Sequence, residues 1–241
     1  MHKSSKDYQK IYNSLKNSKL FANLCDEALD EVIKECEYGT WKKADIIDPY
    51  ITTKRVYFIL NGRVKLLQLN PDNGRSVAIF ILSANDIYDF FSLLDGKEHD
   101  IEPIALDNVE YISFSIDKTR EWIDKHPEFN REFLPYLGEK MRELESFGES
   151  VALYDTTTRL AHLILKNTDS CKDDTGHYPV KLIHNMSHET LAELIGSVRS
   201  VVSLQMKKLR QDGVIVSKRG HLAVANLEKL IKKCDILHLE S

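Results

Sequence analysis

Apolar residues in the first part of the chain recur at steps of three and four, the spacing that places them on one side of an amphipathic helix. The residues that follow this spacing are Tyr8, Ile11, Tyr12, Leu15, Leu29, Val32 and Ile33. We therefore expect one or two helices between Lys6 and Cys36.

After Glu37 the pattern changes to short runs rich in β-branched and aromatic residues, which are typical of strands. These runs are Arg55 to Leu60, Arg63 to Leu69, Arg75 to Leu82 and Glu110 to Ile116. The turn-forming sequences among them are Asn61-Gly62, Pro71-Asp72-Asn73-Gly74 and Asp95-Gly96. Because short turns join neighbouring antiparallel strands, this part of the chain is predicted to form an antiparallel sandwich or barrel.

Helical spacing returns near Asp117 and, after His126-Pro127-Glu128, continues to about Tyr154. Apolar residues there alternate steps of three and four, which is typical of a coiled-coil seam. They are Phe133, Leu137, Leu144, Phe147, Val151 and Tyr154. Lys140 interrupts this stripe. The pattern predicts a helix through which two copies of the chain dimerise, and the alternative is that the stripe packs on the chain's own sheet.

The run Thr156-Thr157-Thr158 is preceded by Asp155, whose carboxylate makes it a good N-cap for a further helix. We expect this helix to extend to about Asn167 and place the interdomain hinge at Asp155.

Residues 186–224 carry the clearest functional pattern. Ser187 is the expected N-cap of a short helix, Gly196 permits a tight turn, and a second helix is expected to begin near Ser197. The core-facing side of the second helix is expected to hold Val202, Met206 and Leu209. Two short strands at residues 214–216 and 221–224, joined by Ser217-Lys218-Arg219-Gly220, complete a winged helix-turn-helix.

A helix that presents arginine and hydroxyl groups after such a turn is the arrangement that enters the major groove of DNA. Arg199 can donate two hydrogen bonds to guanine, and Ser200 and Ser203 can contact a base edge or a phosphate. Ser187 can bind phosphate, and the basic turn of the wing can contact the DNA backbone. The predicted DNA-binding residues are Ser187, Ser197, Arg199, Ser200, Ser203, Lys207, Lys218 and Arg219.

The net charge of the chain is −4, which taken alone argues against a nucleic-acid partner. From Gly196 to Lys233, however, nine basic residues stand against two acidic ones, a net charge of +7, while the rest of the chain is acidic. Such segregation suits a domain that meets phosphate. On charge alone, a solvated basic face without a partner is the alternative.

Taken together, these motifs resemble the cyclic-AMP receptor protein/FNR (Crp/Fnr) family of bacterial transcription regulators. The likeness covers nearly the whole chain and is best in the stretches Val56 to Val64 and Leu191 to Ile215. It implies an α+β fold with an N-terminal antiparallel β-roll, which is jelly-roll-like and cyclic-nucleotide-binding-like. The expected domains are a β-roll sensor with its N-terminal helices at 1–127, a dimerisation helix at 128–154, and a winged helix-turn-helix at 155–241. The resemblance also implies a homodimer on a near-palindromic operator of double-stranded DNA, with RNA polymerase as a further partner.

Two departures from the family pattern bear on specificity and on the signal. Where family members carry a glutamate and a second arginine in the recognition helix, this chain has Ser200 and Leu204, which puts a standard operator in doubt. Between Asp86 and Glu102 six acidic residues stand against Lys97 alone, where nucleotide-binding members hold a cyclic phosphate. We therefore do not expect cyclic AMP to bind. The candidate effector pocket contains Asp89, Phe90, Asp100, Ile101, Leu144 and Glu145.

The signal itself stays open between a neutral or cationic small molecule, a metal held by the acidic stretch, a heme, and no effector. The four cysteines, Cys25, Cys36, Cys171 and Cys234, are too dispersed for the iron–sulfur cluster of some family members or for a zinc site. Candidate axial ligands for heme are His2, His99, His126 and His162. We expect no zinc between His184 and His188, since His184 should precede the helix that Ser187 caps.

No motif of a nucleophilic or phosphate-binding enzyme is present, so no enzymatic activity is expected. The longest apolar run, Val77 to Leu82, is far short of the roughly 20 residues of a membrane span. No apolar export segment follows the N-terminus, and a cytoplasmic location is expected. The rival interpretation is a sensor whose basic C-terminal domain binds a protein.

Overall fold

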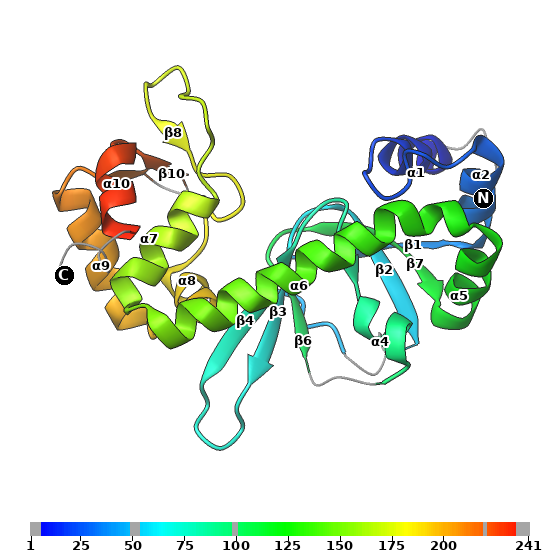
Figure 1. Ribbon diagram of the computed structural model, residues 1–241, viewed down its shortest axis with the longest axis horizontal. Helices are drawn as coiled ribbons and strands as arrows, with labels where there is room; N and C mark the ends of the chain where they lie inside the picture. Colours follow the sequence, from blue (N-terminus) through cyan, green and yellow to red (C-terminus); the bar gives the residue numbers. More distant parts are fainter. Residues whose placement is uncertain (1–5, 49–53, 98–100, 219–220, 235–241) are drawn as a thin grey trace. The chain divides into compact units, whose positions relative to one another are not determined.

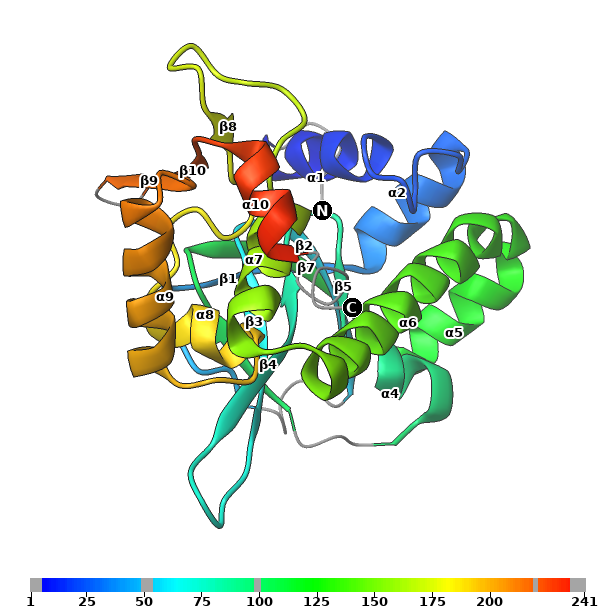
Figure 2. The same ribbon diagram turned by 60° about the vertical axis from the view of Figure 1, so that its left-hand side comes forward.

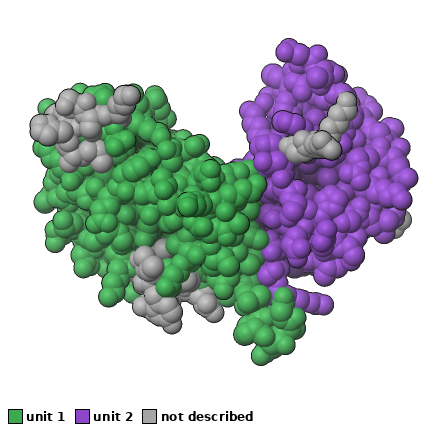
Figure 3. Space-filling model, turned by 180° about the vertical axis from the view of Figure 1, so that it is seen from behind, with its two compact units in different colours: residues 1–74, 79–143 green, residues 75–78, 144–241 purple. Residues whose placement is uncertain are grey.

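The computed structural model describes residues 6–48, 54–97, 101–218 and 221–234 of the 241-residue chain. The chain divides into two compact units (Figure 3). Unit 1 contains residues 1–74 and 79–143, and unit 2 contains residues 75–78 and 144–241. No helix in the described ranges is both long enough and apolar enough to cross a lipid bilayer.

Two amphipathic helices open unit 1, as the apolar spacing predicts. They are α1 (Lys6–Lys16) and α2 (Asp26–Glu35). On α2, the side chains of Leu29, Val32 and Ile33 are buried, which anchors the helix to the unit. The first turn of α2 carries acidic residues and its last turn carries Lys34. These charges are opposite in sign to the partial charges of the helix ends and therefore stabilise the helix.

Two antiparallel sheets form the body of unit 1 (Figure 1). The four-stranded sheet has the order β1 (Glu37–Trp41), β7 (Val109–Ser115), β2 (Arg55–Asn61), β5 (Ile87–Tyr88). The three-stranded sheet has the order β4 (Ser76–Leu82), β3 (Val64–Leu69), β6 (Glu102–Ala105). The four predicted strands are present within one or two residues, whereas β1, β5 and β6 lack a strong strand pattern and were not predicted.

The turn Asn61-Gly62 between β2 and β3 needs its glycine. Gly62 has a φ of +86°, a backbone conformation that L side chains rarely adopt. A Cβ atom at this position would also lie 2.6 Å from the carbonyl oxygen of Asn108. The predicted turn at Asp95-Gly96 is different, because it is the C-terminal end of the short helix α4 (Phe90–Asp95), which Gly96 caps with a φ of +72°.

Three helical elements follow the sheets: α5 (Ile116–Lys125), the 3-10 turn η1 (Pro127–Phe129) and α6 (Asn130–Leu153). Ser115 caps α5 by accepting a hydrogen bond from the backbone N–H of Lys118 at 3.2 Å. The chain leaves the α5 helix at His126, the residue before Pro127, as expected from the clash between proline and a helical predecessor.

The first turns of α6 correct the predicted dimer seam. Phe133, Tyr136 and Lys140 are buried within unit 1. The Lys140 ammonium pairs with Asp86 at 2.8 Å and lies 5.4 Å from the ring centre of Tyr136. The stripe drawn through Phe133 is therefore wrong at this end, where the alternative of packing on the chain's own unit holds. A different side of α6 is open, with Leu134 63% and Met141 70% exposed.

Unit 2 contains helices α7 (Thr156–Lys166), α8 (His188–Leu194), α9 (Arg199–Gln211) and α10 (Leu227–Cys234). Its three-stranded sheet has the order β8 (Tyr178–Pro179), β10 (His221–Val224), β9 (Ile215–Lys218). Asp155 caps α7 by accepting a hydrogen bond from the N–H of Thr158 at 2.8 Å, as predicted. The expected α+β class, with an antiparallel sheet domain, a long helix and a helix-turn-helix, is confirmed.

Candidate nucleic-acid interface

The helix-turn-helix consists of α8, a turn around Gly196, and α9, which pack against each other in unit 2 (Figure 2). Ser187 is the N-cap of α8, and its hydroxyl accepts a hydrogen bond from the N–H of Thr190 at 3.1 Å. Gly196 has a φ of +59°, and the N–H of the half-buried Ser197 then donates to the carbonyl of Ala192 at 2.9 Å. Helix α9 therefore begins at Arg199, two residues after the predicted start.

The α9 helix has a buried side and an open side. Val202, Met206 and Leu209 are buried, as the apolar spacing predicts. Ser200, Leu204 and Lys207 are exposed and are spaced four and three residues apart, so they form one stripe along the helix. Leu204 is 52% exposed. The open side is thus a mixed surface, with a hydroxyl, an apolar side chain and an ammonium group in line.

Four cations of α9 are exposed: Arg199, Lys207, Lys208 and Arg210. None of the four side chains makes a hydrogen bond or an ion pair within the described part of the chain. Lys229 and Lys233 differ, because they bind the carbonyl and the carboxylate of Asp212 at 3.0 and 2.9 Å. Part of the basic charge of this segment therefore stabilises unit 2, and the charge on α9 is available to an anion.

Ser203 is less available than the sequence pattern predicts. Its hydroxyl lies 2.8 Å from Nδ1 of His188, so this bond ties α9 to the first residue of α8. Burial lowers the pKa of His188 below its usual 6.5, and the charges of Arg210 and Arg199 lower it further. A neutral imidazole is therefore held between the two helices. The spacing of 15 residues follows no helical period, so the sequence gives no sign of this pair.

The wing is formed by β9 and β10, which pair antiparallel with His221 opposite Lys218 and Val224 opposite Ile215. Lys218 ends β9, but its side chain and Arg219 lie outside the described residues. Their predicted contacts to the DNA backbone therefore stay predictions.

The candidate effector residues are distributed over both units, so the pocket that they are expected to form stays a prediction. Asp89 is buried, has a φ of +69° and caps α4 by accepting a hydrogen bond from the N–H of Ser92. Phe90 and Ile101 are also buried in unit 1. Asp100 lies outside the described residues, and Leu144 and Glu145 belong to unit 2.

The acidic stretch around Asp89 is used largely within the fold. Asp86 pairs with Lys140, and Asp95 accepts a hydrogen bond from the N–H of Lys97 at 2.9 Å. Among the described residues, no group of three or more His, Cys, Asp or Glu side chains is arranged to hold a metal ion.

Two of the histidines considered for heme have other partners. His126 lies 3.0 Å from Glu31 and 3.3 Å from Glu128, and the ring of His162 packs edge-on against Tyr154. His2 and His99 lie outside the described residues. His184 precedes α8, as expected, and hydrogen-bonds to the carbonyl of Lys181. All four cysteines carry free thiols.

Comparison with known proteins identifies the C-terminal part of the chain. The profile of the Crp-like helix-turn-helix domain matches residues 158–233. A global nitrogen regulator of Synechocystis sp. is 26% identical over 211 residues, which cover 86% of this chain and 90% of that protein. The CRP-like cAMP-activated global transcriptional regulator of Mycobacterium tuberculosis is 23% identical over 179 residues, which cover 74% of this chain and 79% of that protein.

Solved structures share the fold over most of the chain. A CooA mutant from Carboxydothermus hydrogenoformans has a TM-score of 0.72 at 19% identity, over 90% of this chain and 100% of its own. FixK2 from Bradyrhizobium japonicum has a TM-score of 0.68 at 17% identity, over 82% of this chain and 96% of its own. The chain therefore contains a Crp-like helix-turn-helix domain and is similar over most of its length to DNA-binding transcription regulators of the Crp/Fnr type.

Proposed function

We propose that this protein is a cytoplasmic homodimer that binds a near-palindromic DNA operator through α9 and works with RNA polymerase. The observation that carries the proposal is the open side of α9, where unpaired cations flank exposed Ser200 and Leu204. In a helix-turn-helix the second helix enters the major groove and reads base edges. A dimer would place one such helix in each half-site, about one helical turn apart.

Each side chain then has a distinct role. Arg199, in the first turn of α9, donates two hydrogen bonds to a guanine, while Ser200 contacts a neighbouring base edge. Lys207 binds phosphate, as do Ser187 and Ser197 at the turn and Lys218 and Arg219 at the wing. Ser203 plays a smaller part, since its hydroxyl is bonded to His188.

Leu204 has no hydrogen-bonding group, yet it stands in the middle of the open side of α9. The apolar feature that duplex DNA presents in the major groove is the methyl group of thymine. We therefore expect Leu204 to contact the methyl group of a thymine. The expected operator then differs from that of a family member whose recognition helix has a second arginine at this position.

The dimer would form through the open side of α6. Leu134, Leu137 and Met141 are three and four residues apart, and Leu134 and Met141 are exposed. This spacing gives two helices a shared seam. It supports residues 128–154 as the dimerisation helix, between a sensor domain at 1–127 and a DNA-binding domain at 155–241.

Control by a signal other than cyclic AMP completes the proposal. The stretch from Asp86 to Glu102, where family members that bind nucleotides hold the cyclic phosphate, carries six acidic residues and one lysine. Asp86 is paired with Lys140, but the stretch supplies no arginine to clamp a phosphate. We expect the signal to act on the β-roll and the long helix.

The test is binding of the purified chain to duplex DNA selected from a random pool, measured by fluorescence anisotropy at several salt concentrations. The affinity should fall steeply with salt because phosphate contacts release counterions. Lys207→Ala should weaken binding to all sequences alike and lower the slope of log K against log salt by about 1. Lys172→Ala removes the same charge from an exposed loop of unit 2 and should leave both quantities unchanged.

Failure to bind any duplex at low salt would overturn the proposal and favour a protein partner for the basic domain. Equal effects of the two lysine variants would show that α9 is not the interface.

A further inference from the structure

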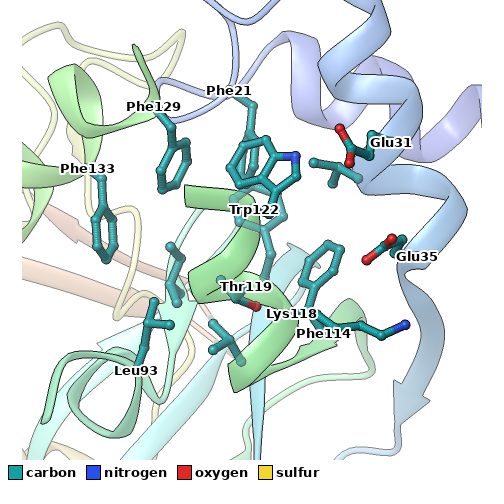
Figure 4. A pocket seen from close by; sticks show the side chains of 14 residues that line it. Phe21, Glu31, Glu35, Leu93, Phe114, Lys118, Thr119, Trp122, Phe129 and Phe133 are labelled. Carbon is teal, nitrogen blue, oxygen red and sulfur yellow. The ribbon is translucent and has the colours of Figure 1, made fainter. Parts of the chain in front are cut away.

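Unit 1 contains a pocket that no DNA-binding role explains. It lies between α2, α4, α5, the start of α6 and the four-stranded sheet (Figure 4). Ten of its 14 lining residues are apolar, and six of these ten are aromatic. Phe21, Phe129 and Phe133 form one side of it, and all three are buried. A pocket lined in this way favours an apolar ring.

The size of the pocket limits what it can hold. It has about 570 Å³ of space outside the protein atoms, with open water at its mouth included. The centres of water-sized groups can move through about 50 Å³ of this space. This is about a third of the roughly 150 Å³ of a cavity known to hold benzene, so a ring enters only when side chains at the open mouth move apart. A single small ring is therefore the largest group that the pocket can take, and a nucleotide is too large.

Trp122 supplies the polar feature of the pocket wall. The side chain is 9% exposed, and its Nε1–H has no hydrogen-bond partner among the residues that the structure describes. Figure 4 shows this nitrogen turned toward the side of the pocket where Glu31 lies. A buried N–H without a partner is costly, and an acceptor on a ligand would remove that cost once neighbouring side chains make room.

The charged groups around the pocket disfavour an anionic ligand. Glu31 and Glu35 line the same side of the pocket, and Lys118 is the one cation among its described lining residues. Hydrogen bonding from His126 lowers the pKa of Glu31, so its carboxylate stays charged at neutral pH. A hydroxyl group suits this side, because it can accept from the Trp122 N–H and donate to a carboxylate.

We propose that this pocket binds a small uncharged aromatic molecule that carries a hydroxyl group. The ring lies among the phenylalanines, and the hydroxyl bridges the Trp122 N–H and the glutamate side. The site lies wholly in unit 1 and contains none of the candidate effector residues, although Ile87 and Leu93 in its wall belong to the same segment as Asp89. Phe133 belongs to the second turn of α6, so occupancy acts on the helix that continues into unit 2. That regulatory role rests on the proposed function, whereas the binding site itself does not.

The test is isothermal titration calorimetry of the full chain with phenol, which is uncharged at pH 7, and with toluene and benzoate as matched probes. Phenol should bind one molecule per chain, and benzoate should bind at least tenfold more weakly. Trp122→Phe keeps an aromatic ring but removes the N–H. It should weaken phenol binding roughly five- to tenfold, the effect of one neutral hydrogen bond, and leave toluene binding unchanged.

Val32→Phe provides a second variant, which fills the pocket and should abolish binding of both phenol and toluene. Circular dichroism of each variant reports whether the fold is retained. No heat of binding with phenol at millimolar concentration would overturn the proposal, and so would phenol binding that Trp122→Phe and Val32→Phe leave intact. Since none of these titrations contains DNA, they can succeed or fail independently of the DNA-binding proposal.

Discussion

The pocket of unit 1 and the open side of α9 in unit 2 differ in where their functional side chains come from and in how deeply these side chains are buried. The α9 surface comes from one helix of 13 residues, and its polar side chains project into solvent. The pocket draws side chains from Phe21 to Phe133, and most of them are buried. A surface of the first kind can change its specificity one residue at a time without touching the core. In the pocket, most of the side chains that would contact a ligand are buried and therefore also support the fold.

Phe133→Ala gives the largest effect that follows from this difference. Phe133 is buried against Phe129 and Tyr136, with ring centres 5.3 and 6.4 Å away. Truncating a buried phenylalanine should lower the free energy of unfolding by about 3–5 kcal/mol. Ser200→Ala, on the open side of α9, should change it by less than about 0.5 kcal/mol. Urea unfolding followed by circular dichroism measures both, and comparable losses would contradict the contrast between the two regions.

Arg199→Ala should leave stability unchanged and weaken DNA binding. Loss of a bidentate contact to guanine costs about 1–3 kcal/mol, roughly five- to 150-fold in affinity. The loss should be confined to one base pair of each half-site, so the variant should accept other bases there. Competition binding with single-base operator variants measures this. Arg131→Ala removes the same charge from the exposed surface of unit 1 and serves as the control. Equal losses for the two variants would mean that only overall charge matters.

The α9 surface is predictable from the sequence because it depends on a local period. Spacing alone separates buried Val202 and Met206 from exposed Ser200 and Lys207. The same holds for the cap at Asp155 and for the strands between tight turns. Where a structure depends only on residues close in sequence, a single sequence therefore predicts both the helix or strand and the side of it that is buried.

The pocket and the α8–α9 contact depend on pairs that are distant in sequence, and no period reveals them. Trp122 fits the amphipathic pattern of α5 like any core residue, and only the packed structure reveals that no acceptor in the described ranges meets its N–H. Lys140 interrupts an apolar stripe, which in the sequence looks like a defect of the seam. The structure explains why a lysine stands at this position, because its ammonium group forms an ion pair with Asp86 inside unit 1.

Leu204 tests whether the α9 surface also reads an apolar feature. Replacing one thymine of the operator by deoxyuridine removes only the methyl group. At about 0.8 kcal/mol for a buried methyl-sized group, this should weaken binding about fourfold at one position. Leu204→Ala should bind the two operators almost equally, because the partner of the methyl group is gone. If deoxyuridine weakens the parent protein and the Leu204→Ala variant alike at every thymine, the methyl group is read by another residue.

The smallest effect concerns His188, which joins the open side of α9 to α8. Its pKa is lowered in the folded protein by burial and by Arg210 and Arg199, so below its usual value of 6.5 the unfolded chain takes up a proton more readily. Stability from this group is therefore complete above pH 6.5 and is lost as the pH falls through the folded pKa. His188→Asn can keep a hydrogen bond to Ser203 but cannot titrate in this range. Between pH 7.5 and 5 the parent should lose more unfolding free energy than this variant in urea denaturation, and parallel losses would show that another group titrates.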